Sequence, residues 1–198
     1  ASLIACNSVD KKTEVEQDAP IIGKVAVTTQ NGIMTPEILH SFGRVSDIQL
    51  SPDKSTILYG VTYVSIDQNK TNRELFTIKT DGSGKNQITQ TPKSENNAVL
   101  VKDGAKIAFL SSESGSSQIW EMNPDGTERK QISDIEGGID GFTYSPDGKK
   151  IMYIKNIKFG ETTADRYSDL PNASGRIVYN LMYKHWDHWV EEIPHTFY

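Results

Sequence analysis

The side chains with the clearest chemical potential stand near the end of the sequence, where Glu191 and Glu192 follow Trp189-Val190. Ionised carboxylates accept strong, charge-assisted hydrogen bonds from cationic groups such as an ammonium. Alternate residues of an extended chain point to opposite sides, so only one of the two carboxylates would reach a given ligand. The pair could therefore bind a cationic group, or it could be two solvated carboxylates in a loop.

Two histidines in the same region, His185 and His188, flank Asp187 and raise the question of a metal site. On a helix this spacing could place both imidazoles together, but the sequence offers no third ligand at a known spacing. A packing or hydrogen-bonding role is favoured for both histidines. We therefore expect no metal ion and no cofactor.

The single cysteine, Cys6, follows Leu3-Ile4-Ala5. One cysteine excludes an internal disulfide, and apolar or small residues before it resemble a bacterial lipobox, in which the thiol carries a lipid. The polar segment 7–19 cannot bury enough apolar area to fold and would act as a flexible tether. We expect residues 1–19 to be a signal remnant and tether, and the protein to be a periplasmic or outer-membrane lipoprotein of the cell envelope. The alternative is a buried cysteine at a frayed end.

Charge and hydropathy exclude several partners. The chain has 21 basic and 26 acidic residues and a net charge of −5, whereas nucleic-acid binders normally show a basic stripe. No apolar run reaches the roughly 18–20 residues of a transmembrane helix. We expect no nucleic-acid partner, and membrane contact only through a lipid on Cys6.

The elements that must position these side chains are revealed by an internal repeat. Residues 74–82 (ELFTIKTDG) match residues 118–126 (QIWEMNPDG), and the tails Gln87-Ile88-Thr89 and Gln131-Ile132-Ser133 keep the same offset of 44 residues. A second motif, an aspartate turn followed by apolar residues, recurs at Asp53, Asp103 and Asp147. Repeats of about 40–50 residues that contain several short strands are typical of β-propeller blades.

The aspartates of these turns allow two interpretations. Asp53, Asp81, Asp103, Asp125 and Asp147 could be read as calcium ligands. Their Ser-Pro-Asp-Gly and Asp-Gly contexts favour turns in which the carboxylate accepts hydrogen bonds from the backbone two residues on.

The repeat predicts an all-β fold, a partial β-propeller of about three to four four-stranded blades with one short helix at 35–42. Blade repeats cover about 44–156 of a propeller segment over 20–198, with a first strand near 21–27 and a further partial blade at 176–198. Propellers close with about four to eight blades, so three units would leave open sheet edges, which could support self-association.

The blade motif resembles the TolB-like propeller repeat. Thr35-Pro36-Glu37, Phe42-Gly43-Arg44 and, above all, residues 176–195 (RIVYNLMYKHWDHWVEEIPH) resemble the N-terminal propeller of prolyl oligopeptidase family serine peptidases, closest to the bacterial dipeptidyl-peptidase 5 group.

The resemblance implies an α/β-hydrolase domain with a Ser-Asp-His triad on further polypeptide, because no Gly-x-Ser-x-Gly motif occurs in this sequence. We expect no catalytic residue in this chain and no activity from it alone. The propeller would gate access of a peptide substrate, and Glu191 and Glu192 would help bind the substrate's N-terminus. The alternative is a self-standing TolB-like module for protein interactions in the envelope.

Overall fold

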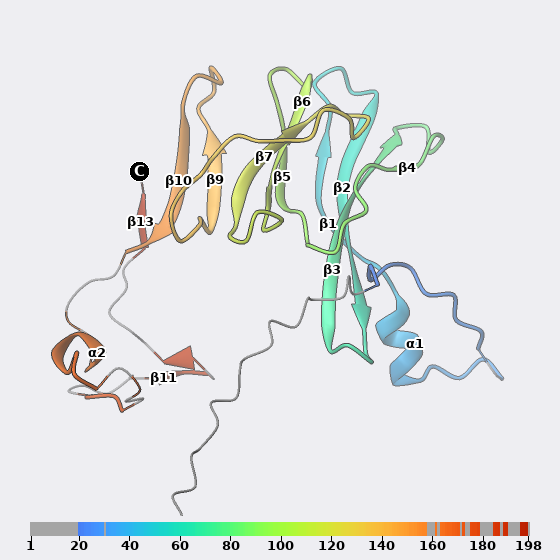
Figure 1. The fold of residues 1–198 in the computed structure, drawn as a ribbon. Helices are drawn as coiled ribbons and strands as arrows, with labels where there is room; N and C mark the ends of the chain where they lie inside the picture. The colour runs from blue at the N-terminus through green and yellow to red at the C-terminus, as the bar shows by residue number, and fades with distance from the viewer. Residues whose placement is uncertain are drawn as a thin grey trace, which may run out of the picture.

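Three antiparallel sheets stand side by side in an open arc (Figure 1). The computed structural model describes residues 20–29, 31–157, 161, 163–170, 172, 175–178, 184–186, 188–189 and 195–197. Within these residues the arc does not close into a ring. The predicted all-β, partial propeller is confirmed, and the strands β1 to β10 fall within the predicted repeat region 44–156.

Each complete sheet is a four-stranded meander in chain order. The first consists of β1 (Arg44–Leu50), β2 (Thr56–Ser65), β3 (Lys70–Lys79) and β4 (Asn86–Gln87). The second consists of β5 (Asn96–Val101), β6 (Lys106–Ser111), β7 (Gln118–Met122) and β8 (Lys130–Gln131). Strands at equivalent positions of the two sheets contain the matching repeat residues, so the 44-residue offset reflects one blade.

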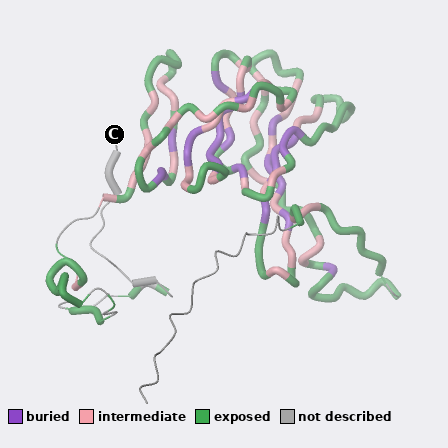
Figure 2. The backbone as a smooth tube through the Cα atoms, in the orientation of Figure 1, coloured by how far each residue is buried: buried purple, intermediate pink, exposed green. Residues whose placement is uncertain are grey.

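The core lies between adjacent sheets. Leu58 and Leu75 of the first sheet pack against Ile107 and Phe109 of the second, and all four are almost completely buried. Alternate residues of the second sheet (Val101, Ala108, Leu110 and Ile119) face the third and form a separate cluster with Ile139 and Phe142. Figure 2 shows this burial concentrated on the facing strands. Because side chains alternate along a strand, the middle sheet contributes to both clusters.

The aspartate turns have the geometry that turn capping predicts. Asp53 Oδ1 accepts hydrogen bonds from Ser51 Oγ at 2.5 Å and from the Ser55 amide at 3.1 Å. Asp147 accepts from Ser145 Oγ at 2.5 Å and from the Lys149 amide at 3.1 Å. The hydroxyl groups of Ser51 and Ser55 lower the pKa of Asp53 to about 2.

The predicted helix is present as α1 (Pro36–Ser41), capped by Thr35 and started by proline. A second, one-turn helix, α2 (Thr163–Arg166), was not predicted. Among the residues described, no helix is long and apolar enough to cross a bilayer.

The first strand predicted near 21–27 is wrong, because residues 20–29 form no strand. Ile22 instead packs against the face of the first sheet, beside Val61, Tyr63 and Phe76. Its carbonyl oxygen lies 3.4 Å from the Asn72 Nδ2 donor. An apolar segment that lies on the face of a sheet buries side chains without joining the hydrogen-bonded ladder.

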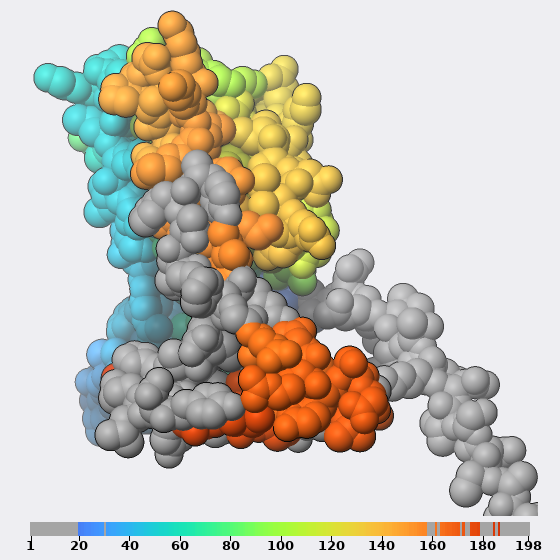
Figure 3. Space-filling view, turned by 90° about the vertical axis from the view of Figure 1, so that its left-hand side faces the viewer, coloured from blue at the N-terminus to red at the C-terminus, as the bar shows by residue number. Residues whose placement is uncertain are grey.

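The third sheet differs from the other two in its last strand. β9 (Gly141–Tyr144) and β10 (Ile151–Asn156) are followed by β13 (His195–Phe197), which pairs with β10 so that Asn156 lies opposite His195. Residues 176–198 were predicted to begin a further blade; their described strand β13 instead completes this sheet. The chain between β10 and β13 contains α2 and the hairpin of β11 (Lys184–His185) and β12 (His188–Trp189). Figure 3 shows the α2 region as a mass below the sheets.

Candidate functional site

The residues singled out from the sequence fall mainly outside the described part of the chain: Cys6, Glu191 and Glu192 all do. His185 and His188 lie opposite each other in the β11–β12 hairpin, not on a helix, so the helical spacing considered for a metal site does not apply. Among the described residues no group of three His, Cys, Asp or Glu side chains is placed to hold a metal ion.

A buried carboxylate in β3 is the first candidate for a functional group in the described structure. It belongs to Glu74, the first residue of the repeat at 74–82. Glu74 is fully buried. It accepts hydrogen bonds from Thr89 Oγ1 at 2.7 Å, from the Thr91 amide at 3.0 Å and from Asn72 Nδ2 at 2.8 Å. Thr89 Oγ1 in turn accepts from the Leu75 amide at 2.8 Å. The side chain therefore fastens the segment that follows β4 to the third strand.

The second sheet repeats this arrangement with a neutral side chain. Gln118 Oε1 accepts from Ser133 Oγ at 2.8 Å and from the Ile135 amide at 3.0 Å, and Ser133 Oγ accepts from the Ile119 amide at 2.8 Å. Gln118 Nε2 donates to the Ile135 carbonyl at 2.8 Å and to Ser116 Oγ at 2.9 Å. An amide can thus fill this position completely, and the negative charge of Glu74 is an additional feature of the first sheet.

A second buried carboxylate lies close to the first. Glu95 ends the connection from β4 to β5 and is fully buried. Its Oε1 accepts from Arg129 at 2.8 Å and from Thr91 Oγ1 at 2.9 Å. Its Oε2 is buried and has no hydrogen-bond partner among the described residues. Buried polar atoms are usually paired, so this oxygen requires an explanation.

Arg129 is the cation of this cluster. It reaches back from the segment before β8, and its guanidinium lies 4.8 Å from the ring centre of Phe109 and 5.4 Å from that of Trp120. It also pairs with Glu113 at 3.0 Å. Arg129 therefore connects a carboxylate at the junction of the first two sheets to the aromatic core of the second.

The burial of these groups changes their acidity. Burial, with a smaller contribution from the charge of Glu74, raises the pKa of Glu95 to about 7 against the opposing effect of Arg129. Burial also raises the pKa of Glu74. Since the two carboxyl groups interact, they titrate as a pair. Both side chains have no exposed surface, so this pair can hold a proton but cannot touch a substrate.

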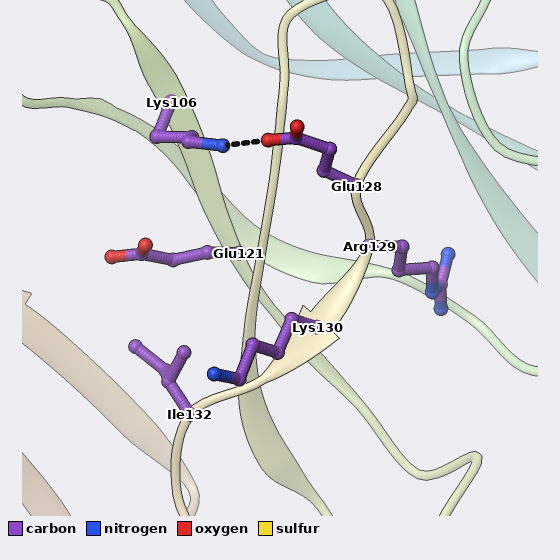
Figure 4. A pocket seen from close by; sticks show the side chains of 6 residues that line it. All are labelled: Lys106, Glu121, Glu128, Arg129, Lys130 and Ile132. Carbon is purple, nitrogen blue, oxygen red and sulfur yellow. Dashed lines mark hydrogen bonds and ion pairs between the residues drawn. The ribbon is translucent and has the colours of Figure 1, made fainter.

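An open hollow of about 470 Å³ lies on the other face of the second sheet, lined by Lys106, Glu121, Glu128, Arg129, Lys130 and Ile132 (Figure 4). Lys106 pairs with Glu128 at 2.8 Å. Glu121 accepts from Lys102 at 2.7 Å and from the Tyr144 hydroxyl at 2.8 Å. The Arg129 side chain points away from the hollow. Lys106, Glu128 and Glu121 are paired, and the lining residues include no serine, threonine, cysteine or histidine.

Sequence reasoning missed the buried carboxylates, although one signal was available. Thr89 follows Glu74 by 15 residues, and Ser133 follows Gln118 by 15 residues. A hydroxyl residue at the same sequence separation from an acid or amide in both repeats indicates that each blade makes the same contact between its third strand and the segment after its outer strand.

Comparison with known proteins shows that the chain is similar to part of proteins named as dipeptidyl peptidases. No family model matches it. It is 50% identical over 194 residues, 96% of its length, to dipeptidyl-peptidase 5 from Porphyromonas gingivalis, and 41% identical over 86% of its length to dipeptidyl-peptidase 5 from Porphyromonas endodontalis. It spans only 28% and 25% of these two proteins.

Solved structures share the fold. The Pyrococcus horikoshii acylaminoacyl peptidase matches with a TM-score of 0.50 at 18% identity, over 62% of this chain and 19% of that chain. A putative TolB from Agrobacterium tumefaciens matches with a TM-score of 0.45 at 26% identity, over 53% of this chain and 36% of that chain. The predicted propeller fold is confirmed by the match to the acylaminoacyl peptidase.

Proposed function

This chain is a homologue of the dipeptidyl-peptidase 5 proteins, and on that premise we propose that it is the propeller segment of a serine dipeptidyl peptidase. The observation that carries the proposal is the 50% identity, which extends over 96% of the chain. Because the chain spans about a quarter of those relatives, we assign the Ser-Asp-His triad to further polypeptide. The segment gates substrate access and helps bind the peptide's N-terminus.

The chemistry assigned to Glu191 and Glu192 follows from the cost of moving an ammonium out of water. Anionic acceptors offset that cost through charge-assisted hydrogen bonds. Once the substrate's N-terminus is fixed, the scissile bond lies at a set distance from it. Binding of the N-terminus therefore determines which peptide bond is cleaved.

The first experiment assays fluorogenic Xaa-Xaa dipeptides with the 198-residue chain and with the product of the extended reading frame. We expect turnover only from the longer form, because the chain contains no Gly-x-Ser-x-Gly motif. Turnover by the 198-residue chain would overturn the assignment of the triad. A longer frame without the motif, or without activity, would favour a protein-interaction module instead.

The second experiment tests the carboxylates in the active, longer form. Glu191→Gln or Glu192→Gln should lower kcat/KM by about tenfold to a hundredfold, the equivalent of one charged hydrogen bond. The loss should vanish for substrates with an acetylated N-terminus. Glu128→Gln, an exposed carboxylate of the hollow, is the control and should change nothing. Equal losses for free and acetylated substrates would refute the assigned role.

We also propose that Cys6 carries a lipid that anchors the protein in the bacterial envelope. Metabolic labelling with a fatty-acid probe should mark the wild-type protein when it is expressed with its own leader. Cys6→Ser should abolish the label and release the protein into the soluble fraction. Labelling that survives this substitution would refute the proposal.

A further inference from the structure

The first and second sheets meet at a group of side chains whose charge depends on one proton. We propose that Glu74, Glu95 and Arg129 form a pH-sensitive link between these two sheets, tight while the two carboxyl groups hold one proton between them and weakened when that proton is lost. This link is independent of the peptidase assignment.

The repeat itself shows that a neutral side chain can make the same contacts. Gln118 makes the equivalent contacts to Ser133 and Ile135 as a neutral amide. In the first sheet the same position is an acid, and a second acid, Glu95, lies near it with one buried oxygen unpaired. A proton on that oxygen explains how it can be buried, because it removes the like-charge repulsion and the cost of burying a second charge.

The position of the cluster couples the two sheets. The Glu95 amide donates to the Arg73 carbonyl of β3 at 3.0 Å, and the Glu95 side chain binds Arg129 at 2.8 Å. Arg129 packs on Phe109 and Trp120 of β6 and β7. Glu95 thus holds the third strand of one sheet with its backbone and the aromatic core of the next with its carboxylate.

The charges around the cluster do not compensate for loss of the proton. Tyr63 of β2 faces Glu74, and Glu113 in the β6–β7 connection shares Arg129. Arg73 of β3 pairs with Asp47 of β1, not with the cluster. With both carboxyl groups ionised, Arg129 is the one described cation paired with the cluster, and it divides its charge between Glu95 and Glu113.

The direct test is a carbon-13 NMR titration of the full 198-residue chain with carboxyl-labelled glutamate. We expect one glutamate to titrate far above the exposed ones. Glu95→Gln should remove this signal, and Glu74→Gln should shift its midpoint downwards because the like charge is gone. Glu113→Gln, which also contacts Arg129 but is partly exposed, should leave it high. If every wild-type glutamate titrates in the ordinary range, the proposal is wrong, whatever the variants do.

Hydrogen exchange tests the mechanical consequence. The protection of the Glu95 amide, at the link, is compared with that of the Ile132 amide, which donates to the Ile119 carbonyl in the second sheet. The ratio of the two cancels the intrinsic pH dependence of exchange. It should fall by about tenfold between pH 5.5 and pH 8, as a shift of one pKa unit implies, and stay constant in Glu95→Gln, which has no proton to lose. A wild-type ratio that does not change with pH would overturn the link.

Discussion

The first and second sheets solve the same packing problem with side chains of different charge. In both sheets a buried side chain of the third strand holds the segment that follows the outer strand. Glu74 binds Thr89 and Thr91 after β4. Gln118 binds Ser133 and Ile135 after β8. The amide both accepts and donates, so its contacts are complete within the sheet. The carboxylate only accepts, and its charge acts on a second acid, Glu95, which is paired with Arg129.

The difference teaches that geometry and charge are separable in this fold. The hydroxyl and backbone contacts are set by the blade and are common to both sheets. The ionic cluster belongs to one junction only and makes that junction dependent on pH. Four sets of substitutions would break or sharpen the comparison.

The largest effect is expected from Arg129→Met, which removes the cation of the first junction while keeping an apolar chain over Phe109. Breaking a buried ion pair leaves a charge uncompensated and costs about 3–5 kcal/mol. The loss should be measured by urea unfolding at pH 8 and should be smaller at pH 5, where the pair of carboxyl groups holds a proton. The control is Lys106→Met, which loses a pair with the exposed Glu128 and should cost less than about 1 kcal/mol. Equal losses from Arg129→Met at both pH values would contradict the interpretation.

Gln118→Glu places a carboxylate, as in Glu74 of the first sheet, at the matching position of the second sheet. Among the described residues no arginine contacts this position. An ionised carboxylate cannot donate to the Ile135 carbonyl or to Ser116 Oγ, and we expect a loss of about 2–3 kcal/mol at pH 8. Because burial raises the pKa of such an acid, its protonated form is favoured in the folded state. Stability is therefore retained below the unfolded pKa and lost as pH rises through the folded pKa. Gln90→Glu, at an exposed position, adds the same charge and should be nearly neutral. A Gln118→Glu loss that does not vary with pH would count against this account.

The hydroxyl groups give a finer comparison. Thr89→Val removes a donor to a charged acceptor, and Ser133→Ala removes a donor to a neutral one. Hydrogen bonds to charged groups are stronger, so we expect losses of about 2 and about 1 kcal/mol respectively. Thermal or urea unfolding at pH 8 measures both. The comparison fails if Ser133→Ala costs as much as Thr89→Val.

The smallest effect is expected at the exposed aspartate turns. The lowered pKa of Asp53 means that its ionised form stabilises the fold above the unfolded value near 3.8, and that this contribution is lost as pH falls towards about 2. Asp53→Asn should thus reduce stability slightly at pH 6, with the difference from wild type vanishing in acid. Asp103→Asn, in the equivalent turn of the second sheet but without the flanking serines, should change even less. Acid unfolding curves of the two variants and the wild type measure both differences in stability.

The fold was largely predictable because one blade repeats. The offset of 44 residues and the aspartate turns located the strands of both complete sheets, and Thr35-Pro36 located α1. The repeat could not predict the partner of β10, because β13 is separated from it by a long stretch without repeat character.

The carboxylate cluster was harder to predict for a physical reason. Glu95 and Arg129 lie in connections, where exposed polar residues are the normal expectation. Their contact spans 34 residues between two segments that do not match each other in the repeat. Glu74 lies in a strand at a position where alternation allows a polar residue, so only its contact with Thr89 distinguishes it from a surface side chain.

The pairing of Asn156 with His195, between β10 and β13, bears on how much the length of the connection between these strands can change. β2 and β3 are joined by residues 66–69, whereas β10 and β13 are joined by residues 157–194. Lengthening a closed loop about tenfold costs only about 2 kcal/mol of chain entropy. The length of this connection therefore costs little entropy, and a shorter or longer connection should leave the register of β10 and β13 unchanged.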